Sequence, residues 1–321
     1  MSSSGDFSVA EDDIEVLILN SYDLFNDGKF QEAEKIYEKA LSVDFENADI
    51  IAGLKCTKFW IERGKQLEAL GSDEYAKSEY LYGEWKIFTE FINRFKTPFR
   101  QGISIIKQWV FKSALSGYLH ASTDISSGDE ELLLRIGKCY KGMGDYDKAL
   151  EYLESVSRKK RDDPEILAEL ADSYAFINEI RIAKAFFREA FFIDPQKVNI
   201  NFLESELIVR LIEKLKVLGY SNKILKEWLP VFAVIWGVFN VKRELRPLEL
   251  GKLKQSVFSL ENRISDSNSE EEKAVLVPRL INRYFWLIDH YIIIGETREK
   301  VEEILRKIRV IDESVYDQYI N

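Results

Sequence analysis

The residues that could do acid–base or nucleophilic chemistry are few and scattered in this sequence. The two histidines, His120 and His290, lie far apart along the chain. The two cysteines, Cys56 and Cys139, have no second cysteine at the spacing of a redox or zinc motif. The chain also lacks an HExxH metal motif, a phosphate-binding glycine loop and a GxSxG nucleophile elbow. We therefore expect structural histidines and cysteines, no catalytic residue, no metal site and no cofactor.

The negative charge of the chain is concentrated at its beginning. The 321 residues have a formal net charge of −10, and residues 1–50 hold 13 acids against three lysines, which accounts for the whole excess. Because phosphate repels an acidic protein, we do not expect a nucleic-acid partner. The acidic start has two interpretations: a solvated cap on a helical array, or a docking surface for a basic partner.

Composition and apolar runs also limit where the protein can reside. The N-terminus has neither the basic stretch nor the apolar core of a secretory signal. The longest apolar run, from Trp228 to Val241, is shorter than the roughly 20 residues of a membrane-spanning helix. Two thiols in a chain of this length fit a reducing compartment. We therefore expect a cytoplasmic protein with no membrane insertion.

The elements that would position a binding site are helices that repeat along the chain. Glycine and proline are scarce, with 16 and 6 residues, which favours long helices. Gly28 is followed by Ala33, Tyr37 and Ala40, and small, aromatic and turn-forming residues recur in this order. Small residues let two helices approach closely, and the glycine permits the chain to reverse. The pattern is found in residues 14–47, 130–163 and 164–197.

This pattern resembles the tetratricopeptide repeat (TPR) family, whose unit is a 34-residue antiparallel helix pair. The resemblance implies an all-α, right-handed helical solenoid over residues 14–197. A further repeat is interrupted, because residues 48–61 continue the first repeat while its expected second helix follows only at 108–128. We therefore predict a helical insertion at about 62–107. The alternative is a degenerate repeat followed by an unrelated helical hairpin.

Outside the repeats the sequence predicts two flanking regions. We expect residues 1–13 to form a disordered acidic N-terminus and residues 198–321 to form degenerate helical repeats that cap the solenoid. Within the cap, Ser265 to Glu272 is typical of a flexible loop. Residues 238–263 also resemble the tails of bacterial TPR proteins that scaffold periplasmic flagellar motors.

The TPR resemblance places candidate partner-binding residues on the first helix of each repeat, since these helices line a concave groove in the family. The candidates are Ile18, Tyr22 and Phe25 in the first repeat, Phe59 and Trp60 in the second, and Arg135, Lys138 and Lys141 in the third. In the fourth repeat the same register reaches Glu165, Ala168, Glu169, Asp172 and Phe176. The predicted insertion adds an aromatic helix stripe formed by Tyr82, Trp85 and Phe88.

Two occupants could fill the apolar part of this groove: the inserted helices themselves, or an apolar helix of a partner. Either way, the sequence predicts a non-catalytic scaffold or adaptor that binds a protein partner through the groove or the aromatic insertion. The alternative is a structural subunit of a homo- or hetero-oligomeric assembly, such as a motility or secretion machine.

Overall fold

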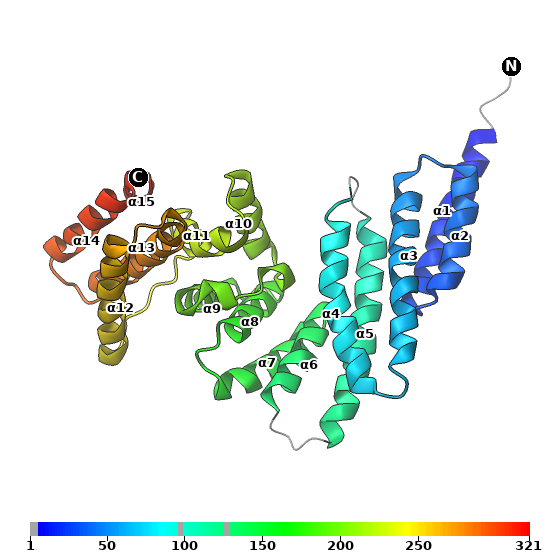
Figure 1. Ribbon diagram of the computed structural model, residues 1–321, viewed down its shortest axis with the longest axis horizontal. Helices are drawn as coiled ribbons and strands as arrows, with labels where there is room; N and C mark the ends of the chain where they lie inside the picture. Colours follow the sequence, from blue (N-terminus) through cyan, green and yellow to red (C-terminus); the bar gives the residue numbers. More distant parts are fainter. Residues whose placement is uncertain (1–5, 96–98, 125–128) are drawn as a thin grey trace. The chain divides into compact units, whose positions relative to one another are not determined.

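The computed structural model describes the backbone of residues 6–95, 99–124 and 129–321, and side chains from residue 14 onward, except 96–98 and 123–128. Over these ranges the regular structure is helical, as Figure 1 shows. The prediction of an all-α, TPR-like solenoid is confirmed. The helices are α1 Asp6–Asn26, α2 Phe30–Val43, α3 Ala48–Ala69, α4 Glu74–Ile92, α5 Arg100–Asp124, α6 Glu130–Met143, α7 Tyr146–Lys159, α8 Pro164–Phe176, α9 Ile180–Ile193, α10 Glu206–Val217, α11 Asn222–Ile235, α12 Pro247–Asp266, α13 Glu270–Ile293, α14 Arg298–Ile311 and α15 Glu313–Ile320.

Polar caps decide where several of these helices begin. The carboxylate of Asp129 accepts hydrogen bonds from the N–H groups of Glu131 and Leu132 at the start of α6. Asp163 does the same for α8, where Pro164 occupies the first helical position and gives up no hydrogen bond by lacking an N–H. At its other end α6 stops at Gly144, whose φ of 85° reverses the chain.

The described chain divides into two compact units, residues 1–152 and 153–321. The predicted boundary lay at residue 197, after the last clear repeat, whereas the observed division falls inside α7. The reason is the packing of the fourth predicted repeat. Ala171 of α8 and Phe187 of α9 belong to the same buried core as Leu229 of α11 and Phe285 of α13.

The first unit differs from the predicted interrupted repeat. α1 pairs with α2, and α3 packs mainly on α2. α5 is one continuous helix that combines the end of the predicted insertion with the expected second helix of the second repeat. It packs mainly on α4 and α6 and also contacts α1. α4 and α5 therefore form a helical hairpin of their own after α3, which fits the alternative interpretation better than a split repeat.

The flanking regions are more helical than the sequence suggested. α1 begins at Asp6, so the predicted disorder of residues 1–13 does not hold from residue 6 onward, and residues 1–5 lie outside the described residues. The predicted loop between Ser265 and Glu272 is reduced to residues 267–269, because α13 already begins at Glu270 with a cap from Ser269. α15 was not predicted.

Candidate partner-binding groove

The candidates of the first repeat lie against the chain's own helices. Phe25 is fully buried and its ring stacks on Tyr37, with 5.8 Å between centroids. Tyr22 is half-buried, and its ring lies 6.0 Å from that of Phe99, just before α5. Ile18 is half-buried on the same helix. The first-repeat groove is therefore occupied by the segment that leads into α5, and Phe25 has no surface to offer a partner.

The aromatic candidates of α3 and α4 are brought together in one buried cluster. The Trp60 ring lies 5.3 Å from Phe88 and 5.4 Å from Trp109, and Phe59 lies 5.1 Å from Phe88. Trp85 is 4% exposed and packs on the same Phe88. Partner binding by these aromatic residues stays a prediction, and their burial leaves little side-chain surface for it, because helical stripes bury against each other when the chain offers a matching face.

The basic candidates of α6 are also engaged. Arg135 donates to Glu79 at 3.0 Å and its guanidinium lies 4.5 Å from the ring centroid of Tyr82, another candidate that is buried. Lys138 and Lys141 are 2% and 6% exposed. Partner binding by these basic residues stays a prediction, and their burial leaves little of the two lysines exposed at the third repeat.

The potentially reactive groups have structural surroundings. Nδ1 of buried His290 accepts a hydrogen bond from the N–H of Leu245 at 3.1 Å. Burial raises the pKa of the Cys56 thiol to about 12 and raises that of Cys139 as well, so both thiols are protonated at neutral pH. Among the described residues, no group of His, Cys, Asp and Glu is arranged to hold a metal ion. None of the described helices is long and apolar enough to cross a membrane.

An open groove exists in the second unit, where the first helices of two successive pairs, α8 and α10, lie side by side. Its volume is about 640 Å³, within the range of ligand-binding clefts. The end of α8, the exposed face of α10 and residues 236–238 line it. The main lining side chains are Phe176, Leu207, Arg210, Lys214, Trp236 and Val238. We call this the α8–α10 groove.

Asp172 fixes the base of the groove. Its buried carboxylate accepts hydrogen bonds from the N–H groups of Glu204 and Ser205, which ties the start of α10 to α8. Ser205 lines the groove, and its Oγ is buried without a hydrogen-bond partner among the described residues. In the first turn of α10 the N–H of Ile208 already donates to the carbonyl of Ser205, whereas the N–H groups of Glu206 and Leu207 have no acceptor within the helix. The base of the groove therefore contains unused hydrogen-bonding capacity.

Trp236 forms one wall, at the point where α11 has ended. The ammonium of Lys214 lies 3.7 Å from the centroid of a Trp236 ring, which is the geometry of a cation–π contact. On its other side Trp236 packs on Phe232, with 5.0 Å between centroids. The wall thus presents an aromatic surface and a cation together.

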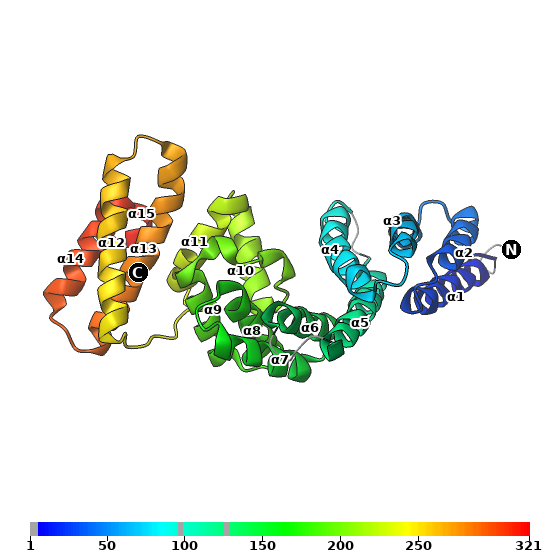
Figure 2. The same cartoon turned by 60° about the horizontal axis from the view of Figure 1, so that its bottom comes forward.

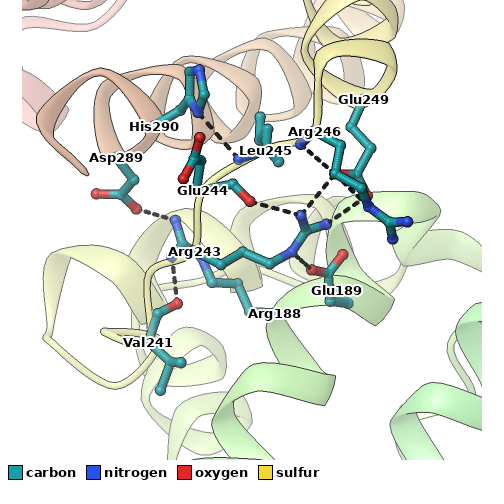
Figure 3. Close-up of polar contacts among 10 residues, drawn as sticks. All are labelled: Arg188, Glu189, Val241, Arg243, Glu244, Leu245, Arg246, Glu249, Asp289 and His290. Carbon is teal, nitrogen blue, oxygen red and sulfur yellow. Dashed lines mark hydrogen bonds and ion pairs between the residues drawn. The ribbon is translucent and has the colours of Figure 1, made fainter. Parts of the chain in front are cut away.

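A polar network, buried at Arg188 and Asp289 and partly exposed at Arg243, holds the irregular segment 236–246 that supplies this wall, as Figure 3 shows. Arg188 of α9 pairs with Asp289 of α13 and also donates to the carbonyl of Val241 at 2.6 Å. Arg243 bridges Glu189 and Glu249, with nitrogen–oxygen distances of 2.5 and 3.0 Å. The segment is therefore fixed from both α9 and α12, although it has no regular structure of its own.

The sequence located only part of this groove. Asp172 and Phe176 were placed on a groove face by the repeat register, and the structure puts Phe176 on the groove wall and Asp172 beneath α10. Trp236 and the α10 residues were missed, because the repeat pattern fades after Pro195. A signal existed: Ser205 followed by an amphipathic stretch is typical of a helix start.

Comparison with known proteins agrees with this helix arrangement. Residues 24–47 and 117–173 each match a tetratricopeptide repeat model. The second match begins in α5 and ends in α8, so it covers the α6–α7 pair. A search of curated proteins finds no match, and the resemblance of residues 238–263 to flagellar-motor scaffolds gains no support. The paired helices and the two matches show that the chain contains tetratricopeptide repeats, at residues 24–47 and 117–173.

Proposed function

We propose that this protein is a non-catalytic adaptor that binds a segment of a partner protein in the α8–α10 groove. TPR units are in general protein-interaction modules. The observation that supports the proposal is the groove itself, because it is open in a chain whose other predicted groove residues pack against its own helices. Its lining combines apolar surface, two cations and one buried hydroxyl, that of Ser205, which has no hydrogen-bond partner among the described residues.

The chemistry of the lining specifies the kind of segment that fits. Phe176, Leu207 and Trp236 offer apolar contact, while Arg210 and Lys214 outnumber the one lining carboxylate, Glu206. A segment with an apolar side chain beside an acidic one matches this surface. The polar backbone of the segment would meet the start of α10 near Ser205.

The test is a binding comparison between two double charge-reversal variants. Arg210→Glu with Lys214→Glu changes the groove, whereas Lys216→Glu with Lys223→Glu changes two exposed lysines that do not line it. Proteins captured from the source cell would be identified by mass spectrometry, and their binding segments would then be titrated by calorimetry. Loss of a partner from the groove variant alone supports the proposal. Equal retention by both variants refutes it.

A further inference from the structure

A second groove, distinct from the α8–α10 groove, runs between α12 and α14 over α13. Two cavities of about 720 and 300 Å³ share Glu261, Tyr284 and Lys307 among their lining residues. The ion pair between Glu261 and Lys307, 3.0 Å long, spans the place where the cavities meet. We call the two together the α12–α14 groove, and Figure 2 shows the three helices that form it near the C-terminus.

The groove exposes large apolar side chains. Val310 of α14 is 88% exposed and Phe258 of α12 is 65% exposed, and each lines one of the two cavities. Exposed apolar surface of this kind marks an interaction site when it gathers in one depression. α12 and α14 each pack on α13, so the groove has the form that accepts one further helix.

The charges around the groove favour an acidic occupant. The side chains that line the two cavities include four cations and two carboxylates, Glu261 and Glu303. Glu261 is already bonded to Lys307 and to the hydroxyl of Tyr284. Lys254 and Lys300 approach the ring of Tyr291, and Lys300 also pairs with Glu296, which does not line the cavities. Counted over the lining side chains alone, the groove has two more cations than carboxylates.

The chain itself contains a helix of matching chemistry. α1 carries six acidic residues and no basic residue in its 21 positions. One face of α1 packs inward through Ile14 and Phe25, but its outer face leaves Val16 54% and Leu19 55% exposed. A helix face that is exposed to solvent is expected to be mostly polar. Val16 and Leu19 depart from that expectation.

We propose that the α12–α14 groove binds α1 of a second copy of this chain. In this contact Val16 and Leu19 lie against Phe258 and Val310, while the exposed Glu15 and Asp23 of α1 face the lysines and arginine of the groove. The contact is heterologous, since two different surfaces meet. Each added copy leaves one α1 and one groove free, so association continues as the concentration rises.

The test measures the mass of the full-length protein in solution by sedimentation velocity and light scattering. Over roughly a hundredfold range of concentration, the average mass of the wild type should rise above the 37.4 kDa of one chain. Added salt should weaken the association, because the charges involved are exposed. A mass that stays at one chain throughout overturns the proposal.

Two variants separate the two surfaces. Val16→Glu with Leu19→Glu alters α1, and Phe258→Glu with Val310→Glu alters the groove; all four residues are exposed, and circular dichroism checks that the helices persist. Each variant alone should remain monomeric. Mixed, they should form a one-to-one pair that cannot extend, because one supplies an intact groove and the other an intact α1.

The mixture also discriminates between modes of association. A mixture that stays monomeric overturns the proposal, as does association of either variant alone, which would point to a symmetric contact elsewhere. The matched control is Val217→Glu with Leu248→Glu, two residues that are 86% and 72% exposed but line neither cavity. It should associate like the wild type.

Discussion

Phe99 packs against Tyr22, with 6.0 Å between their ring centroids, although 77 positions separate them in the sequence. Phe99 also meets Tyr37 edge-on at 6.4 Å. Through these contacts the start of α5 covers the face of α1 that a partner would otherwise use. The occupant of the apolar first-repeat groove is thus the chain itself.

Replacing Phe99 by alanine should therefore destabilise the first unit. Its side chain is 2% exposed, and truncating a buried phenylalanine costs about 3–5 kcal/mol in the free energy of unfolding. Urea unfolding would measure the loss, and hydrogen exchange should quicken in α1 and α5. Phe45→Ala is the control, because Phe45 is 74% exposed and its loss should change stability by less than about 0.5 kcal/mol. Equal effects of the two substitutions would contradict the packing described.

Alanine substitutions at two glycines distinguish the cost of backbone strain from the cost of a steric clash. Gly28 and Gly144 both have positive φ, 73° and 85°, so an alanine at either costs about 1–2 kcal/mol. A Cβ at Gly28 would also lie 2.3 Å from the indole of Trp109, whereas Gly144 faces open space. Gly28→Ala should therefore lower the urea midpoint of the first unit more than Gly144→Ala does. Equal shifts would show that Trp109 moves aside at no cost.

Removal of Asp289 should strongly destabilise the second unit. Arg188, which is 3% exposed, would keep a buried charge without its carboxylate, and such a loss costs about 3–5 kcal/mol. Glu302→Ala removes an exposed partner of Arg298 and should cost less than about 1 kcal/mol. Urea unfolding of Asp289→Ala beside Glu302→Ala tests this. Similar losses would show that burial of the Arg188 pair contributes little.

Glu249 should stabilise the second unit at neutral pH but not in acid. Burial raises the pKa of its carboxyl, but hydrogen bonds from Arg243 and from the N–H of Arg246 outweigh burial, so the pKa lies below its usual value. A carboxyl whose pKa is lower in the folded state stabilises that state at pH values above the unfolded pKa of about 4.3. This stabilisation is lost as the pH falls through the folded-state pKa. The stability difference between wild type and Glu249→Gln should therefore be largest near neutral pH and shrink in acid.

The control for this pH dependence is Glu213→Gln, since Glu213 is exposed and no ion pair to it is described. Its unfolding free energy should follow the wild-type pH profile. If the difference in unfolding free energy between wild type and Glu249→Gln stays constant from neutral to acid pH, the pKa of the Glu249 carboxyl is not lowered in the folded protein.

Both thiols should resist alkylation in the folded protein. Cys56 and Cys139 are fully buried, and burial raises their pKa values, so iodoacetamide at about pH 8 should add no mass until denaturant is present. Mass spectrometry of the intact protein measures the number of adducts. Ser116→Cys, at an exposed position of α5, is the positive control and should be labelled at once. Labelling of a native thiol at the same rate would disprove its burial.

The sequence by itself determined the helical class and most of the helix pairs. The order of Gly28, Ala33, Tyr37 and Ala40 recurs because antiparallel helices need small residues where they touch and a reversal between them. These are local requirements of neighbouring helices, so they are visible in the order of residues along the chain. The same register placed Phe176 on the face that lines the α8–α10 groove.

Only the tertiary structure decided which faces remain open. A stripe such as Tyr82, Trp85 and Phe88 has the same spacing whether it meets a partner or its own chain, and here Trp60 and Phe111 cover it. Trp236 reaches the groove because Arg188 and Asp289, 101 residues apart, hold the segment that follows it. Such contacts join residues distant in sequence, and their free energy depends on surroundings that local periodicity does not encode.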